Sequence, residues 1–437
     1  MRVERLSPSD LTTLSTDRGP APMNIAAVLL LEQAAGLDLD AVQAVLAGRL
    51  VRVLRLGQRL FHPGLGCGRP VWVDDPHFDL GRHLEVRELR QPAIVDAALA
   101  DAAEVITTPL PRDRPLWRAC LLTGLAGDRA ALILVVHHVL ADGLGGLAVL
   151  AALADGGPPS AAPAACGAGV PSRWMLAADA WRQRAHGIRH PGRVVRVTVD
   201  GLRELGLRDG RPRLAPRTSL NAPTGPTRRV NTVLVPLAAV VEFAHQRGAT
   251  VNDVMLTAIV GALAALLRAR GEDPAELVVS VPVSARASAS AGELGNRTGV
   301  APMRLPTLAD PHERLRRVVA ISRRRRAAPA GASAAPMGVV FRALGHLGVF
   351  QAFIDRQRLV NTFVTNTRGP AHALAFAGHR VSGVIPVAVT SGNVGVTFAI
   401  LSYAGQLAIT LVADPDVVPD RQRLTDLLRT ELERLIR

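Results

Sequence analysis

The sequence predicts an α/β protein built as two similar lobes. In both halves of the 437-residue chain, short apolar segments of strand length alternate with longer segments whose apolar residues recur at helical spacing. The chain is long for one hydrophobic core, and a Gly-, Pro- and Ala-rich stretch at 156–168 separates its halves. We therefore expect a first lobe over 1–170, a linker or crossover over 171–226, and a second lobe over 227–437.

The elements of the first lobe follow from apolar periodicity and from turn and capping residues. The segment 129–138 is an almost unbroken apolar run of strand length, and Asp142 is well placed to cap the helix that follows. The expected strands are 23–32, 59–62, 71–73, 116–123 and 129–138, and the expected helices are 38–53, 93–107 and 143–154.

The second lobe repeats this alternation after an Arg-rich crossover at 171–220, which we expect to be part helix and part surface chain. Thr250 is a suitable cap for a long apolar helix. The expected strands are 228–235, 276–283, 298–305, 360–365, 394–403 and 406–412, and the expected helices are 237–247, 251–270 and 418–437.

The charge of the chain favours anionic partners. The formal net charge is +14, and every basic residue is arginine, whose planar guanidinium fits phosphate and carboxylate groups. Nucleic acid is not expected as a partner, because no binding motif is present and aromatic residues for base stacking make up only 3%. The one local run, Arg323 to Arg326, is expected on a solvated helix face.

Cysteine usage and the absence of apolar leaders favour the cytoplasm. The three cysteines are widely separated and form no CxxC pair, so neither a disulfide framework nor a metal site is expected. No phosphate loop or dinucleotide fingerprint is present. The N-terminus has no signal-peptide pattern, and no apolar stretch approaches the length of a membrane span. We expect any membrane contact to be peripheral, at the inner face.

The stretch from His137 to Gly143, HHVLADG, carries the strongest chemical signal. It lies between the expected strand 129–138 and the expected helix 143–154. An imidazole titrates near neutral pH, so it can take a proton from a nucleophile and return it to a leaving group. Neighbouring side chains of a strand point to opposite faces, so only one of the two histidines can face a given channel. The alternative is a structural role, in which both histidines are buried and hydrogen-bonded to backbone carbonyls.

This stretch resembles the HHxxxDG signature of an acyltransferase superfamily that includes chloramphenicol acetyltransferase, peptide-synthetase condensation domains and the bacterial wax ester synthase/diacylglycerol acyltransferases. Other segments, in order, are similar to the last of these families over nearly the whole chain. They are PLW at 115–117, ND at 252–253, VPVSAR at 281–286, LGNR at 294–297, NTRGP at 366–370 and LSYAG at 401–405. Arg368 and Cys67 depart from the family pattern and put the identity of the acceptor in doubt.

The resemblance implies two chloramphenicol-acetyltransferase-like lobes, each a mixed sheet with helices, with an active-site channel between them. It implies an O-acyltransferase of lipid metabolism that moves an acyl group from acyl-CoA to a long-chain alcohol or diacylglycerol. Coenzyme A then arrives as part of a substrate, and no prosthetic cofactor is implied. The alternative is a same-fold enzyme of specialised metabolism that esterifies or amidates a sugar, polyketide or peptide, with an acyl-carrier protein as a further donor. A non-catalytic scaffold and a lipid-droplet contact are also open.

The same resemblance assigns the site residues. The signature set is His137, His138, Asp142 and Gly143, with His138 as general base. Asp142 pairs with the distant Arg286 or acts as a helix cap alone. Gly143 permits a close approach of backbone to ligand. The remaining residues are expected to orient polar groups or to shape the site, with Trp117 in the core; they are Asn252, Asp253, Asn296, Asn366 and Trp117.

Overall fold

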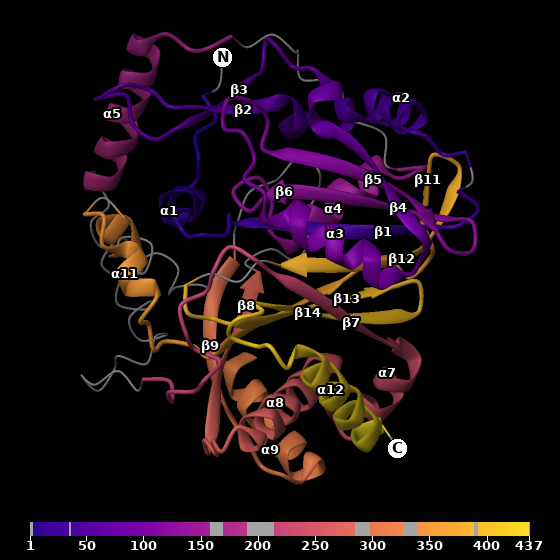
Figure 1. Cartoon of the computed structure of the whole chain (residues 1–437). Coiled ribbons are helices and arrows are strands. Elements are labelled where there is room, and N and C mark those ends of the chain that lie inside the picture. The colour runs from indigo at the N-terminus through magenta and orange to yellow at the C-terminus, as the bar shows by residue number, and fades with distance from the viewer. Residues whose placement is uncertain are drawn as a thin grey trace.

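The computed structural model confirms an α/β fold built on two mixed six-stranded sheets (Figure 1). It describes residues 3–34, 36–157, 169–189, 214–284, 298–326, 340–345, 347–388 and 392–436. Within these residues a two-stranded sheet, β2 (Gln58–Phe61) with β3 (Val71–Asp74), accompanies the two large ones. One large sheet lies above the other in Figure 1.

The first sheet has the strand order β11-β12-β1-β6-β5-β4. Its strands are β1 (Asn24–Leu31), β4 (Leu84–Ala93), β5 (Trp117–Leu125), β6 (Arg129–His137), β11 (Ala375–Phe376) and β12 (His379–Ala388). Strands β1, β5 and β6 read as nearly continuous apolar runs because alternate residues enter separate cores on the two faces of the sheet. β1 and β6 run antiparallel with Asn24 opposite His137, so the start of β1 lies beside the end of β6.

The helices of the first lobe cover both faces of that sheet. They are α1 (Pro8–Thr16), α2 (Leu39–Arg49), α3 (Val95–Thr107) and α4 (Gly143–Leu153), with short 3₁₀ helices at Leu50–Arg52, Leu54–Gly57 and Leu80–His83. The predicted helix 38–53 therefore ends as an α-helix at Arg49 and continues in 3₁₀ turns. α5 (Arg173–Arg189) lies in the predicted crossover, at the edge of the molecule (Figure 1).

The second sheet has the order β7-β14-β13-β10-β8-β9. Its strands are β7 (Arg229–Pro236), β8 (Glu276–Ser284), β9 (Thr298–Pro306), β10 (Thr362–Arg368), β13 (Val396–Tyr403) and β14 (Gln406–Ala413). Its helices are α7 (Leu237–Gln246), α8 (Val251–Ala269), α9 (Pro311–Arg326) and α12 (Arg421–Ile436), and the short α11 (Phe350–Ile354) lies near α5 in Figure 1. α8, α9 and α12 lie below the sheet in that view.

α8 corrects one expectation about membranes. With 19 residues and few charges it is long and apolar enough to cross a bilayer, whereas we expected no segment of that length. Its side chains are instead buried beneath the second sheet, and 78% of its apolar window lies inside the protein. α8 is therefore the core helix of the second lobe.

β12 ties the two lobes together. Although it comes late in the chain, it pairs antiparallel with β1 in the first sheet, from Ile25 opposite Ala388 onward. It also contacts β13 and β14 of the second sheet. The predicted residue boundaries of the lobes stay a prediction, but part of 227–437 completes the sheet of the first lobe.

Candidate active site

In the turn between β6 and α4, one ring nitrogen of His138 has no hydrogen-bond partner among the residues that the structure describes. The backbone N–H of His138 donates to the carbonyl of Met23 at 2.8 Å. Its ring Nδ1 lies 3.2 Å from the carbonyl oxygen of Ala141. Because a carbonyl only accepts, this contact assigns the proton to Nδ1 and leaves the lone pair of Nε2 available. As a whole residue, His138 is partly exposed.

The protonation state of His138 suits a base. Burial lowers the pKa of His138 below its usual value, and the nearby carboxylate of Asp142 opposes this only in part. Desolvation disfavours the imidazolium, so the neutral ring prevails at neutral pH. His138 is thus held in the form that can accept a proton.

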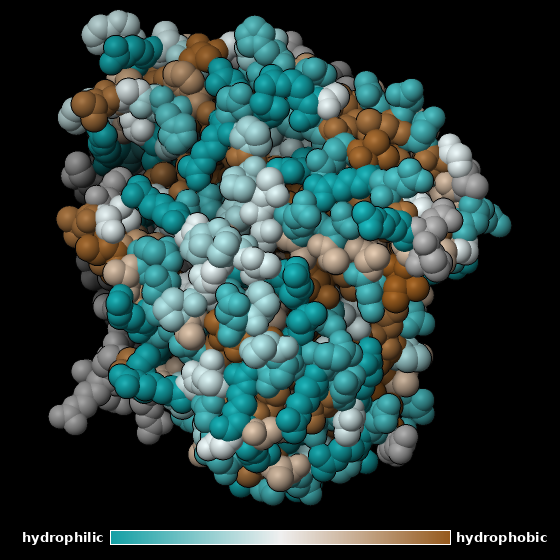
Figure 2. Space-filling view, in the orientation of Figure 1, coloured by the Kyte–Doolittle hydropathy of each residue, from teal (hydrophilic) through white to brown (hydrophobic). Residues whose placement is uncertain are grey.

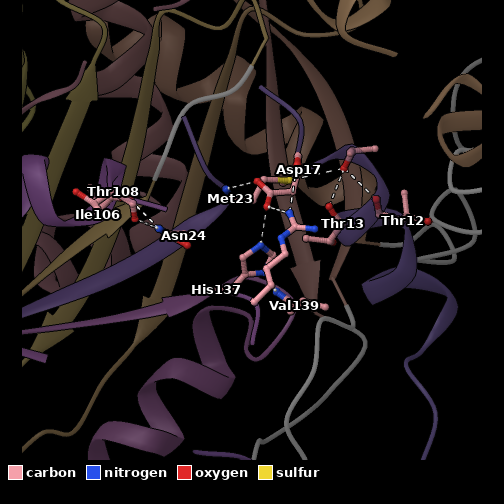
Figure 3. Close-up of polar contacts among 11 residues, drawn as sticks. Thr12, Thr13, Asp17, Met23, Asn24, Ile106, Thr108, His137 and Val139 are labelled. Atoms are coloured by element: carbon pink, nitrogen blue, oxygen red, sulfur yellow. Dashed lines mark hydrogen bonds and ion pairs between the residues drawn. The ribbon is translucent and has the colours of Figure 1, made fainter. Parts of the chain in front are cut away.

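His137 points into the protein and makes a different set of contacts (Figure 3). Its side chain is 4% exposed. Nδ1 accepts the backbone N–H of Val139 at 3.0 Å, and Nε2 lies 3.0 Å from Oδ2 of Asp17. Nδ1 therefore carries no proton, and Nε2–H donates to the carboxylate. His137 acts as a spacer between Asp17 and the turn and has no free nitrogen.

Asp17 follows α1 and collects three donors. Besides His137, its carboxylate accepts the N–H of Met23 at 2.8 Å and Nη2 of Arg112 at 2.7 Å. Burial raises the pKa of Asp17, but the hydrogen bonds from His137 and Met23 and the charge of Arg112 outweigh it, so the pKa is lowered overall. Asp17 is therefore an ionised acceptor bound to His137, just before the segment 138–142 between β6 and α4, which we call the histidine turn.

Asp142 is buried and caps α4. Its Oδ1 accepts the N–H of Gly145 at 2.8 Å, as expected for a helix N-cap. Its expected partner Arg286 lies outside the described residues. Gly143 begins α4 beside the second lobe, where an added Cβ would lie 3.1 Å from Oγ1 of Thr367. Strand β10 thus approaches the histidine turn closely enough to require a small residue there.

Two of the predicted orienting residues meet at the edge of the second lobe. Nδ2 of Asn366, on β10, donates to Oδ1 of Asn252, in the first turn of α8, at 3.3 Å. Asp253 is buried and forms a capping box with Thr250, which accounts for an acid at that position. Asn296 lies outside the described residues. Asn366 precedes Thr367, so the asparagine pair lies near the contact of β10 with Gly143.

Trp117 lies in the core of the first lobe. It is 2% exposed, its Nε1–H donates to the carbonyl of Leu56 at 2.8 Å, and its ring stacks on His83 with 4.6 Å between centroids. Trp117, at the start of β5, therefore packs in the core and supports the first lobe.

Sequence reasoning missed Asp17 and Thr367. Asp17 lies in a polar connection without a motif, and only the pairing of β1 with β6 brings that connection to the histidines. Thr367 was passed over in favour of its neighbour Asn366. One signal was available. The connection that precedes the expected strand 23–32 must end beside the end of whichever strand pairs antiparallel with it, and here that strand is β6.

A two-lobed fold with paired histidines between a central strand and a capped helix is that of an acyltransferase, and the comparisons specify which kind. The family model of the wax ester synthase/diacylglycerol acyltransferase catalytic domain matches residues 6–255 of the sequence. The family model of the WS/DGAT C-terminal domain matches residues 294–436. The chain belongs to the wax ester synthase/diacylglycerol acyltransferase family. The predicted family and enzyme class are thereby confirmed.

Relatives and solved structures agree with this assignment. A probable diacylglycerol O-acyltransferase of Mycobacterium tuberculosis is 30% identical over 91% of this chain and 88% of its own. The wax ester synthase/diacylglycerol acyltransferase of Marinobacter aquaeolei has the same fold, with a TM-score of 0.70 at 22% identity over 99% of this chain and 98% of that one. A starter condensation domain of rhizomide synthetase, solved with C8-CoA, has a TM-score of 0.62 at 18% identity and covers 99% and 95%.

Proposed function

We propose that the enzyme transfers an acyl group from acyl-CoA to the hydroxyl of a long-chain alcohol or diacylglycerol, with His138 as general base. The observation that carries this proposal is the state of the His138 ring. Nδ1 is committed to Ala141, Nε2 has no partner within the described part of the chain, and burial lowers the pKa of the ring, which favours its neutral form. His138 is a partly exposed residue in the turn that β10 of the second lobe approaches.

The reaction needs two proton transfers, and one ring nitrogen performs both. Nε2 of His138 takes the hydroxyl proton as the acceptor oxygen attacks the thioester carbon. The tetrahedral species then collapses, its C–S bond breaks, and the departing sulfur takes the proton back from the imidazolium. The products are an ester and coenzyme A with a free thiol, and no prosthetic group takes part. A positioned acid–base group of this kind contributes about 10²- to 10⁴-fold to the rate.

The names of the curated relatives support a hydroxyl acceptor of the lipid class. The M. tuberculosis relative is named a diacylglycerol O-acyltransferase, and the matched solved enzyme is also named a wax ester synthase. The alternative acceptors, a sugar, a polyketide or a peptide, are not favoured by these names. Acyl-CoA as donor, in place of a carrier-protein thioester, remains part of the proposal.

A competition among acceptors tests the proposal. The purified protein is given one long-chain acyl-CoA and an equimolar mixture of hexadecanol, a diacylglycerol, a sugar and an amino acid, and the products are identified by mass spectrometry. We expect wax ester or triacylglycerol and a matching amount of free thiol. A parallel reaction replaces the donor with the same acyl group on a carrier protein. Acylated sugar or amino acid alone, or product from the carrier donor alone, would contradict the proposal.

We also propose a cytoplasmic protein that touches the inner membrane face or a lipid droplet through α5. Trp174 and Trp181 are 86% and 66% exposed. They are seven residues apart and so share one helix face. Arg182 is exposed on this outer side, and the guanidinium of Arg184 lies 5.7 Å from the Trp181 ring centre. Exposed tryptophan with arginine is typical of a helix that lies in an anionic lipid interface.

The surface of the molecule fits this placement. Figure 2 shows apolar groups among polar ones at the edge where Figure 1 places α5. The inner side of α5 is anchored, because Leu176 belongs to a buried cluster with Val71 and Asp179 pairs with Arg5 at 2.6 Å. The helix is thus held to the protein on one side and presents its tryptophans on the other.

Vesicle co-sedimentation tests the contact. We expect the wild-type protein to bind phosphatidylcholine vesicles containing phosphatidylglycerol and to bind pure phosphatidylcholine more weakly. Replacing Trp174 and Trp181 together by alanine should abolish binding, whereas Ile94→Ala, at a residue that is 59% exposed at the start of α3, should not. A wild-type protein that stays in the supernatant with both vesicles, or equal loss in both variants, would refute a role of α5.

A further inference from the structure

Two hydrogen-bonded routes link Asp17 to the backbone on the two sides of His138, and Figure 3 shows their contacts with Asp17, made by Met23 and His137. On one side, the N–H of His138 donates to the carbonyl of Met23 at 2.8 Å, and the N–H of Met23 donates to Oδ1 of Asp17 at 2.8 Å. On the other side, the N–H of Val139 donates to Nδ1 of His137 at 3.0 Å, and Nε2 of His137 donates to Oδ2 of Asp17 at 3.0 Å.

Both routes therefore end on one carboxylate, one oxygen for each. We propose that Asp17 is a positioning residue, which acts through Met23 and His137 to hold the imidazole of His138 where it meets the reacting hydroxyl. This inference rests on the proposed function, because it assigns Asp17 to the same reaction. Asp17 itself touches no substrate in this account.

The donors and acceptors of this network permit one arrangement. The N–H of Val139 can only donate, so Nδ1 of His137 must be unprotonated and Nε2 must carry the proton. The N–H of Met23 can also only donate. Asp17 thus has to accept at both oxygens, which an ionised carboxylate does and other side chains of its size do not. Nη2 of Arg112 adds a third donor and the balancing charge from the surface, where its side chain is 54% exposed.

An asparagine at position 17 has the same shape but cannot satisfy both routes. If its oxygen faces Met23, its NH₂ group faces the Nε2–H of His137. If its oxygen faces His137, its NH₂ group faces the N–H of Met23. Either orientation opposes two donors and releases one side of the turn. Asp17→Asn is therefore a test of hydrogen-bond pattern at constant volume.

A purely structural role has to be separated from positioning, and Asp155 supplies the matched control. Its carboxylate also holds two backbone N–H groups, of Ala377 at 3.1 Å and Gly378 at 2.7 Å, and it pairs with Arg49 at 2.5 Å. It follows the C-terminal end of α4, whereas the histidine turn precedes the N-terminal end. Asp155→Asn breaks a comparable turn in the same lobe without touching the route to His138.

The experiment measures kcat, the KM for acyl-CoA and the melting temperature of both variants. Misplacing a catalytic group by about 1 Å costs up to about 10²-fold, so we expect Asp17→Asn to lower kcat by at least about tenfold at an almost unchanged KM. Asp155→Asn should leave kcat within about twofold, even at an equal loss of melting temperature.

A spectroscopic readout and the variant His138→Ala distinguish a failure of the positioning role from a failure of the proposed function. In ¹⁵N-histidine spectra, Asp17→Asn should change the tautomer signature of one imidazole, that of His137, which is assigned with His137→Gln. Full kcat in a folded Asp17→Asn variant would overturn the inference, and so would equal losses of kcat in Asp17→Asn and Asp155→Asn. If His138→Ala also keeps full activity, the proposed function fails. If His138→Ala is inactive and Asp17→Asn is fully active, the positioning role alone fails.

Discussion

One methyl group at Gly143 tests the contact between the lobes. The Cβ of an alanine there would lie 3.1 Å from Oγ1 of Thr367, inside the 3.4 Å at which ordinary contact begins. Thr367 must then give way by a few tenths of an ångström. A side chain that is forced about 30° off its rotamer costs about 0.5–1.5 kcal/mol. Alanine is also better than glycine in a helix by up to about 1 kcal/mol. The two effects nearly cancel, so Gly143→Ala should change the free energy of unfolding by less than about 1 kcal/mol.

A double-mutant cycle of Gly143→Ala with Thr367→Ala measures the coupling free energy of this contact. Removing Oγ1 relieves the crowding, so the two changes should couple by about 0.5–1.5 kcal/mol in urea unfolding. The same strain acts next to the histidine turn, so Gly143→Ala should lower kcat/KM by about 2- to 13-fold, and Thr367→Ala should restore it. Additive effects would refute the reasoning. A severe loss that Thr367→Ala leaves unrepaired would place Gly143 against the substrate instead.

Three further outcomes follow from burial and charge. Because burial lowers the pKa of His138, and the base works only when unprotonated, the acid limb of kcat/KM should inflect below pH 6.5; an inflection above it would contradict a desolvated base. Arg314 and Glu431 form a buried pair with side chains 1% and 7% exposed, so Arg314→Leu should lower the free energy of unfolding in urea by about 3–5 kcal/mol, with activity per folded molecule kept. Trp117→Phe leaves the buried carbonyl of Leu56 unpaired and should cost about 1–3 kcal/mol; lost activity at unchanged stability would place Trp117 at the substrate.

Elements with a strong local pattern were predictable from the sequence. The apolar run of β6, the cap Asp142 and the start of α4 at Gly143 all lie where periodicity and capping placed them. The cap Thr250 and the helix after it are equally regular. These features depend on residues within one or two turns of each other, which a sequence records directly.

β4 and β12 were missed because their stability is not local. β4, LEVRELRQPA, is rich in charge and becomes a strand by pairing parallel with β5. β12 contains Gly383 and Pro386, both unfavourable in strands, yet it pairs with β1 over most of that strand's length. The pairing of β12 with β1 joins residues some 360 positions apart, which no local pattern reports.

The candidate site divides in the same way. His138 was predictable because its motif is contiguous, and Asn252 and Asn366 were predicted separately before the fold brought them together. Asp17 was not, because a carboxylate in a polar connection has no distinctive pattern. Its place depends on Asn24 lying opposite His137 in the sheet.

The most direct measurement of the central claim is single-turnover thioester cleavage by His138→Ala. Acyl-CoA and one long-chain alcohol are mixed with excess enzyme, and ester and free thiol are followed together, with acyl-CoA affinity measured separately. We predict that the variant cleaves at least about 10²-fold more slowly than the wild-type enzyme at unchanged affinity, because the hydroxyl proton has lost its acceptor. Ester formation within a few-fold of the wild-type rate would contradict the assignment of His138 as the base.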